Sequence, residues 1–347
     1  MRAHDSHRAL SRAAVAGGGL LALGAALQLR HARRIATDPA RAALAEPPVG
    51  RAVPVRAPDG TRLHAEAFGP EDAATTVVLA HGWTESRAYW IHQIRALSAD
   101  GLRVVAYDLR GHGDSDPAAA GDYSIERFGE DLEAVLASCT VAADRTVVAG
   151  HSLGAMAIAA WAEHHDVRAR VAAAALLNTG MGDLIAEQLL LPVPSVAQAL
   201  HRTIAVRGFL GSRAPLPRFS NPLSYAMIRY IAFGPTASPA QIAFYEWMLI
   251  ASPPDARASI GIALSELELY HALPRLTVPT VVLAGESDRL TPPSHARRIA
   301  QMLPQLEELI VLPRTGHMAP LERPEEVTAA LSSLASQVGA AGVAVAS

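Results

Sequence analysis

The sequence predicts an α/β protein with a mostly parallel sheet, and two patterns along the chain carry this prediction. Short apolar runs rich in β-branched residues, such as Thr76 to Ala80, alternate with longer segments of helical periodicity, such as Ile125 to Ser138. Continuous apolar runs separated by helices are typical of parallel strands buried on both faces. The alternation stops between Asn178 and about Leu276, where Leu, Ala, Pro and aromatic residues follow helical spacing, which indicates a helical insertion.

The folded domain is expected over residues 51–338, with the insertion at 178–276 and a frayed tail at 339–347. Its first two strands, Val53 to Arg56 and Arg62 to Phe68, are joined across Asp59-Gly60, a dipeptide that favours a tight hairpin turn. Further strands are expected at 76–80, 103–107, 146–149, near 177, at 280–284 and at 308–312. Within the insertion, helices are expected at Gln241 to Ile250 and Ile262 to Tyr270.

Composition sets the class of protein. The chain has 347 residues, 50% of them hydrophobic and 18% charged, which is sufficient for a sizeable core. A formal net charge of −3 provides no basic field for nucleic acid, so nucleic acid is not an expected partner. Because Cys139 is the single cysteine, no disulfide can form within the chain.

The first 34 residues differ from the rest of the chain. Ala13 to Leu29 carries no charge and is flanked by arginines on both sides. A spanning helix needs about 17–25 apolar residues, so this segment is short, and its Gly and Ala content makes it weakly hydrophobic. Three interpretations stay open: a membrane anchor, a cleaved signal peptide of an exported protein, or an ordinary N-terminal helix of a cytoplasmic protein. Residues 35–50 are expected to be a linker.

The strongest motif is Gly150-His151-Ser152-Leu153-Gly154, between the strand predicted at 146–149 and an apolar helix predicted at Ala155 to His164. A G-x-S-x-G sequence in this context forms a nucleophile elbow, whose tight turn strains the serine backbone and exposes its hydroxyl. Glycines are needed on both sides because a side chain there would clash with the neighbouring strand or helix. The alternative is an ordinary turn with a capping serine. Ser152 is therefore the predicted nucleophile.

A serine hydroxyl is a weak nucleophile that needs a general base and an acid to orient that base. His317 follows the strand predicted at 308–312, and Asp288 follows the strand predicted at 280–284. Both lie at carboxyl ends of strands, where open α/β sheets place their ligand sites. We predict His317 as the base and Asp288 as the acid, with Glu286 as the main rival acid and Asp183 as a distant one.

Two backbone N–H groups are expected to form an oxyanion hole. One belongs to Leu153, at the start of the helix after the nucleophile, and the other to Trp83 in His81-Gly82-Trp83, after the strand at 76–80. Each such donor is worth about 10²–10³ in rate, because it stabilises the charge of the tetrahedral intermediate. For Trp83 the alternative is a plain strand-to-loop turn.

With these motifs the chain resembles the α/β-hydrolase superfamily over roughly residues 50–335, and in particular its capped esterase, lipase and haloperoxidase-like group. Residues 108–115 (DLRGHGDS) are similar to the family's D-x-R-G-x-G-x-S segment, which is structural, and Gly316-His317 with Glu322 is similar to its G-H-x-x-x-x-E-x-P-E pattern. The resemblance implies an eight-stranded sheet with a helical cap after the sixth strand. Relatives that open epoxides or remove halide carry aspartate at the elbow, so Ser152 disfavours those reactions.

The predicted activity is hydrolysis of small-molecule carboxylic esters through an acyl-enzyme on Ser152, a reaction that needs no metal or other cofactor. Aromatic and aliphatic residues of the insertion favour an apolar ester, although such residues more often only hold a cap together. A cofactor-free perhydrolase or a carbon–carbon bond hydrolase would use the same three residues. A non-catalytic ligand-binding protein on this scaffold is a further alternative.

Overall fold

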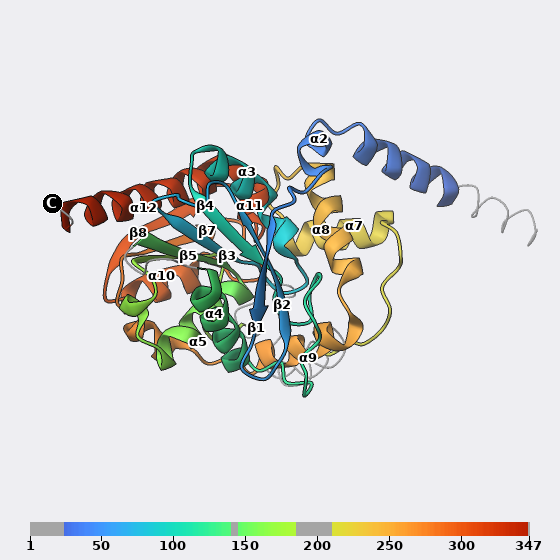
Figure 1. Cartoon of the computed structure of the whole chain (residues 1–347). Coiled ribbons are helices and arrows are strands. Elements are labelled where there is room, and N and C mark those ends of the chain that lie inside the picture. Colours follow the sequence, from blue (N-terminus) through green and yellow to red (C-terminus); the bar gives the residue numbers. More distant parts are fainter. Residues whose placement is uncertain (1–23, 140–144, 185–209, 346–347) are drawn as a thin grey trace, which may run out of the picture.

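The computed structural model describes residues 24–139, 145–184 and 210–345, and an eight-stranded sheet forms its centre (Figure 1). The strand order is β1-β2-β4-β3-β5-β6-β7-β8. β2 pairs antiparallel with β1 and β4, and all other neighbours are parallel. The strands span Arg51–Arg56 (β1), Arg62–Phe68 (β2), Thr76–Ala80 (β3), Arg103–Tyr107 (β4), Thr146–His151 (β5), Ala173–Leu177 (β6), Thr280–Gly285 (β7) and Leu306–Leu312 (β8). The predicted fold class is confirmed.

The strands follow the apolar runs of the sequence closely. Every residue of β3, β5, β6 and β7 is buried, as expected for parallel strands covered on both faces. The predicted hairpin between β1 and β2 forms, with Gly60 at φ 91°, a backbone conformation that favours glycine.

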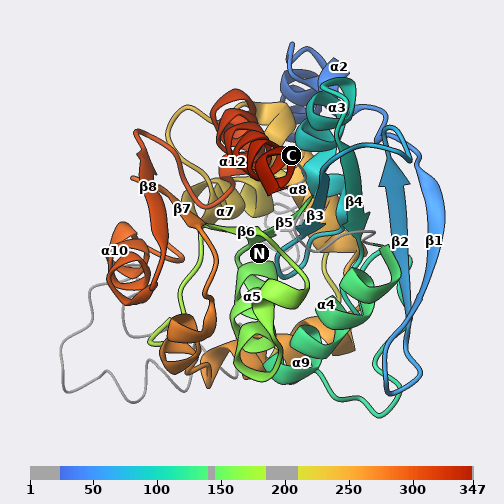
Figure 2. The same cartoon turned by 60° about the vertical axis from the view of Figure 1, so that its left-hand side comes forward.

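Helices cover both faces of the sheet (Figure 2). One layer contains α4 (Ile125–Cys139), α5 (Leu153–His164) and α10 (Pro293–Met302), and the other contains α3 (Ile91–Ala99), α11 (Ala319–Glu322) and α12 (Pro324–Val345). Because side chains alternate along a strand, Val78 of β3 packs in the core under the first layer, whereas Val77 and Leu79 pack under the second. Short 3₁₀ helices complete the layers at Arg87–Trp90 (η1) and Val167–Ala169 (η3).

The described part of the insertion after β6 is helical, with α7 (Pro222–Ala232), α8 (Pro239–Ala251), α9 (Pro254–Ser265) and η6 (Tyr270–Arg275). Capping boxes begin α7 at Asn221 and α8 at Ser238. The helix predicted at Ile262 to Tyr270 was placed too late along the chain. It is α9, which starts at Pro254 because proline is favoured in the first turn of a helix, and it ends at Ser265.

Both ends of the described chain are helical. Residues 24–36 form a helix, and the expected linker holds the short helix α2 (Arg41–Leu44). The segment expected as a tail instead continues α12 to Val345. Residues 13–23 of the uncharged N-terminal segment lie outside the described residues. Among the described residues, no helix has both the length and the apolar character needed to cross a membrane.

Candidate active site

Ser152 occupies the sharp turn between β5 and α5. Its φ of 49° and ψ of −113° are strained for a residue with a side chain, as expected at a nucleophile elbow. A Cβ atom on Gly150 would lie 2.4 Å from the backbone nitrogen of Ala155, and one on Gly154 would lie 2.3 Å from the carbonyl oxygen of Ala80. The two glycines therefore allow the strand, turn and helix to approach closely.

His317 and Asp288 meet directly although 29 residues separate them. The ring nitrogen Nδ1 of His317 lies 2.8 Å from Oδ2 of Asp288. Both residues are buried, and Nε2 of His317 has no hydrogen-bond partner among the described residues. Ser152 and His317 line the same cavity. The structure therefore brings the three predicted residues into one site.

Two residues that sequence reasoning did not assign to the site hold Asp288 in place. The hydroxyl of Thr291 donates to Oδ2 of Asp288 at 2.9 Å, and the side-chain amide of Asn178 donates to the same oxygen at 3.1 Å. The backbone N–H groups of Leu290 and Thr291 donate to Oδ1. The position of Asn178 directly after β6 was the signal for its role, because side chains after parallel strands converge at one edge of the sheet.

Asp288 and His317 support each other's charge. Burial acts to raise the pKa of Asp288, but the charge of His317 and the hydrogen bonds to the carboxylate hold that pKa below its ordinary value. Burial acts to lower the pKa of His317, but the Asp288 carboxylate raises it above the ordinary histidine value. The pair is therefore suited to stabilise an imidazolium after His317 accepts a proton.

The rival acids lie elsewhere. Glu286 is exposed and its Oε2 accepts the backbone N–H of Arg314 at 2.9 Å. Asp183 forms an ion pair with Arg298 at 3.2 Å. Neither carboxylate contacts His317 within the described chain, so the geometry favours Asp288 as its partner.

The backbone N–H groups of Trp83 and Leu153 are both without a hydrogen-bond acceptor among the described residues. Trp83 follows β3, Leu153 is the first residue of α5, and Trp83 shares a cavity with Ser152. The indole nitrogen of Trp83 donates to the carbonyl oxygen of Arg257 at 3.1 Å, which fixes the side chain against the cap. In the described part of the chain, both groups are thus available as donors near Ser152.

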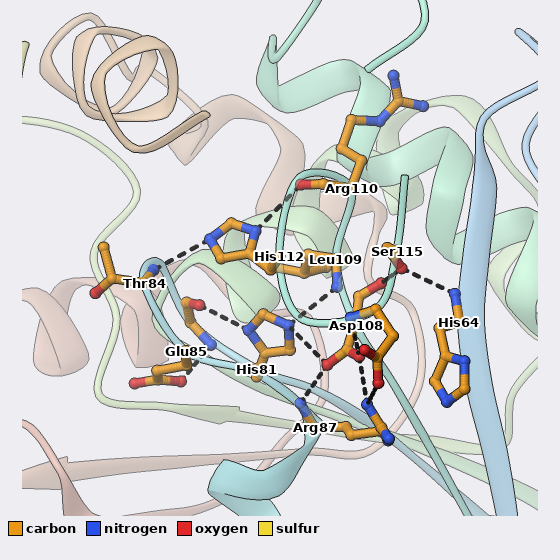
Figure 3. A network of polar contacts seen from close by, with 12 residues as sticks. His64, His81, Thr84, Glu85, Arg87, Asp108, Leu109, Arg110, His112 and Ser115 are labelled. Carbon is orange, nitrogen blue, oxygen red and sulfur yellow. Dashed lines mark hydrogen bonds and ion pairs between the residues drawn. The ribbon is translucent and has the colours of Figure 1, made fainter. Parts of the chain in front are cut away.

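A buried polar layer supports the loop that carries Trp83 (Figure 3). We define this layer as the buried residues His81, Asp108, Arg110 and His112 together with the partly buried Arg87. The N–H of Leu109 donates to Nε2 of His81 at 3.0 Å, and the N–H of Thr84 donates to Nε2 of His112 at 3.1 Å. Burial lowers the pKa of His81 and of His112 to about 3, so both rings are neutral acceptors. The segment at 108–115 thereby anchors the loop after β3.

A second buried pair lies behind His317. His151 donates from Nε2 to the carbonyl oxygen of His317 at 2.9 Å, and its Nδ1 lies 3.1 Å from the carboxylate of Glu85. Glu85 also accepts the N–H of Gly82 at 2.5 Å. The acid was not singled out from the sequence, although its place shortly after β3 was a signal. The pair connects the loop after β3 to the loop that carries His317.

The cavity above Ser152 has a volume of about 260 Å³. Most of its lining side chains are apolar and come from the cap, and the lining also includes Glu85, Arg257 and His317. The apolar members are Met156, Leu184, Leu210, Ala214, Leu216, Met227, Ile228, Ile231, Ala232, Leu249, Leu264, Leu290 and Met318, with Trp83 and Tyr245 as aromatic members.

With this geometry in view, comparison with known proteins identifies the family. The family model for the alpha/beta hydrolase fold matches residues 75–324. The chain belongs to the α/β-hydrolase family. Its hydrolase character therefore rests on the family as well as on the site.

Individual relatives of this α/β hydrolase have several activities. It is 30% identical over 284 residues to a Variovorax paradoxus (strain S110) protein assigned as carbamate hydrolase RutD, covering 81% of this chain and 98% of that protein. The chain is also 28% identical over 269 residues to the non-heme haloperoxidase of Rhodococcus erythropolis. This match covers 76% of this chain and 92% of the haloperoxidase. Among solved structures, a thermophilic esterase of Thermogutta terrifontis with malate bound is 26% identical at a TM-score of 0.66, covering 84% of this chain and 100% of that chain.

In the part of this α/β hydrolase that the structure describes, no three His, Cys, Asp or Glu side chains are grouped so that they could hold a metal ion. The free Cys139 is buried at the end of α4 and is not among the residues that line the cavity.

Proposed function

We propose that the protein is a serine hydrolase that cleaves carboxylic esters through an acyl-enzyme on Ser152. The observation that carries this proposal is the strained elbow at Ser152 in one cavity with His317, whose Nδ1 is held by Asp288 and whose Nε2 has no partner among the described residues. Strain of this kind persists only where the surrounding structure enforces it, and it clusters at functional sites.

In the proposed mechanism, His317 accepts the proton of the Ser152 hydroxyl as the oxygen attacks the ester carbonyl. The N–H groups of Trp83 and Leu153 stabilise the negative charge on the former carbonyl oxygen. His317 then gives its proton to the departing alcohol, which leaves the acyl group on Ser152. Water, deprotonated by His317, attacks the acyl-enzyme and releases the acid. Asp288 orients His317 and stabilises its positive charge throughout.

The cavity lining supports an apolar ester. Its wall is largely aliphatic, and a cavity of about 260 Å³ leaves room for a chain of several carbons beside Ser152. We therefore expect longer acyl chains to be preferred over acetyl esters.

Perhydrolysis is the second candidate, and the haloperoxidase relative from Rhodococcus erythropolis favours it over carbon–carbon bond cleavage. A perhydrolase would use hydrogen peroxide in place of water on the same acyl-enzyme. Formation of peracid from acetate and peroxide at a rate above ester hydrolysis would make it the main activity.

The surface of the cap supports action at a membrane. Leu223, Met227 and Tyr230 form an exposed stripe on α7, with 80%, 47% and 52% of each side chain exposed, and Met227 also lines the cavity. The helix at 24–36 is fastened to the same part of the cap, because Gln28 donates to the carbonyl oxygen of Ser220 at 2.8 Å. We propose that the stripe contacts lipid next to the cavity.

Arginines near this stripe suit an anionic lipid surface. Arg30, Arg34 and Arg229 line one surface pocket together with Tyr230, and none of the three forms an ion pair with a carboxylate of the described residues. Co-sedimentation of the full chain with vesicles containing phosphatidylglycerol tests the proposal. We expect binding that decreases in the triple variant Leu223→Ser, Met227→Ser, Tyr230→Ser. Equal binding by wild type and variant would contradict a role for the stripe.

The esterase proposal is tested by fluorophosphonate labelling of the wild type and of Ser152→Ala, with mass spectrometry of the labelled peptide. We expect label on Ser152 only, together with loss of p-nitrophenyl ester hydrolysis in the variant. The same samples provide a chain-length series from acetate to decanoate. Folded wild-type protein that takes no label would refute the mechanism and favour a non-catalytic ligand-binding protein.

A further inference from the structure

Arg257 is a buried cation in the cavity of the proposed nucleophile. It lies in the first turn of α9, lines the same cavity as Ser152 and His317, and is only 7% exposed. One terminal nitrogen, Nη2, donates to the backbone carbonyl oxygens of Ala214 at 2.6 Å and Ser212 at 3.4 Å. Within the described residues, the side chain of Arg257 has no hydrogen-bond partners other than these two carbonyl groups.

Such a partner set is unusual for a buried arginine. A buried charge is ordinarily paired, because removal from water costs more than neutral acceptors repay. Arg110, the other buried arginine of the described chain, obeys this rule: it forms a bidentate pair with Asp131 and a third contact with Asp59 at 2.8 Å. Arg257 has no carboxylate partner in the described part of the chain, and burial alone lowers its pKa.

The guanidinium has unused donors. Nε and Nη1 of Arg257 make no hydrogen bond to the described residues, and neither is among the buried polar atoms that are closed off without a partner. Both atoms therefore keep some access to solvent, and Arg257 lines the cavity. Each of these donors can give a charge-assisted hydrogen bond to an oxygen of a carboxylate or phosphate.

The other charged groups of the cavity are already engaged. Glu85 contacts the N–H of Gly82 and the ring of His151, and His317 is held by Asp288. Arg257 alone of the lining residues brings a positive charge that no described carboxylate balances. The remaining wall is mainly apolar, so the cavity combines an apolar surface with one cationic group, Arg257.

We propose that Arg257 binds an oxyanion, a carboxylate or a phosphate, which an apolar chain connects to the ester that Ser152 attacks. The substrate is thus an ester whose apolar chain contacts the aliphatic wall and whose anionic group binds Arg257. This inference rests on the proposed esterase function for the role of Ser152, but the binding of the anion does not require catalysis. Arg257 is accordingly a specificity-determining residue.

Calorimetric titration of the full chain with octanoate, octyl phosphate and neutral octanamide tests the inference, because the three ligands share a chain length and differ in charge. We expect the wild type to bind at least one anion about 10-fold or more tightly than the amide, as charge-assisted hydrogen bonds do. Arg257→Met should abolish this preference, and Arg257→Lys should retain part of it. The tighter of the two anions identifies the group as carboxylate or phosphate.

Arg213→Met is the matched control. Arg213 belongs to the same cap segment but is exposed and pairs with Asp255, so its replacement should leave the anion preference unchanged. Thermal melting of each variant verifies that it is folded. A wild type without preference for either anion, or a preference that Arg257→Met leaves intact, would overturn the inference. Fluorophosphonate labelling of Ser152 in the same samples separates this outcome from failure of the esterase proposal.

Discussion

The polar layer around the loop after β3 and the cavity at Ser152 use similar residues in opposite ways. In the layer, Asp108 accepts from the backbone and guanidinium of Arg87, and Arg110 is held by two carboxylates. In the cavity, Nε2 of His317 and two nitrogens of Arg257 have no partner among the described residues. Groups whose hydrogen bonds are all made within the protein fix the geometry of the loops. Donors and acceptors without a partner among the described residues are available to a ligand.

The largest expected effect comes from removing the negative charge of Asp288. Asp288→Asn keeps the side-chain shape but removes the carboxylate that holds His317. We expect kcat to fall by about 10⁴-fold, because an amide favours the wrong imidazole tautomer and does not stabilise an imidazolium. Steady-state hydrolysis of a p-nitrophenyl ester measures this. Glu286→Gln is the control and should remain near wild type; the reverse result would identify Glu286 as the acid.

Replacing each of the two buried arginines, Arg110 and Arg257, by methionine is expected to change the free energy of unfolding by different amounts. Arg110→Met leaves the buried carboxylate of Asp131 without its partner, so we expect the free energy of unfolding to fall by about 3–5 kcal/mol. Arg257→Met leaves no described carboxylate unpaired and loses only bonds to carbonyl groups, so we expect a change below about 1.5 kcal/mol. Urea denaturation measures both. Equal losses would show that Arg257 stabilises the fold as Arg110 does.

A smaller effect is expected in the pH dependence of kcat/KM. His317 must be neutral to accept the serine proton, so activity is lost as pH falls through the pKa of His317. Because Asp288 raises that pKa, the midpoint of the acid limb should lie above the ordinary histidine value of about 6.5. A midpoint below about 6 would mean that burial outweighs the carboxylate.

The smallest effect is expected for the residues that hold Asp288. Thr291→Val removes the hydroxyl that donates to Oδ2 but keeps the backbone N–H bond to Oδ1. We expect kcat to fall by about 3–10-fold, which corresponds to one hydrogen bond. Thr236→Val removes a hydroxyl bond outside the cavity and should leave kcat unchanged. Equal kcat in both variants would show that Thr291 does not position the acid.

Much of the fold was predictable because its signals are local. The strands at β2, β3 and β4 have the predicted bounds, since short apolar runs between turn residues specify buried strands. The turn at Ser152 was predictable for the same reason, because the strand before it and the helix after it are adjacent in the sequence. The helix α9 was misplaced, because apolar spacing alone did not weigh the proline that starts it.

The sequence by itself determined the order of strands and helices along the chain and the strained turn at Ser152. It also indicated the two loops, after β7 and β8, that carry the predicted acid and base. Only the tertiary structure decided that His317 meets Asp288 and not Glu286, and that Asn178 and Thr291 support the pair. It also decided that Arg257 lines the cavity without a carboxylate partner among the described residues. The physical reason is that turn and strand preferences depend on neighbouring residues, whereas side-chain partners depend on contacts between segments far apart in the chain.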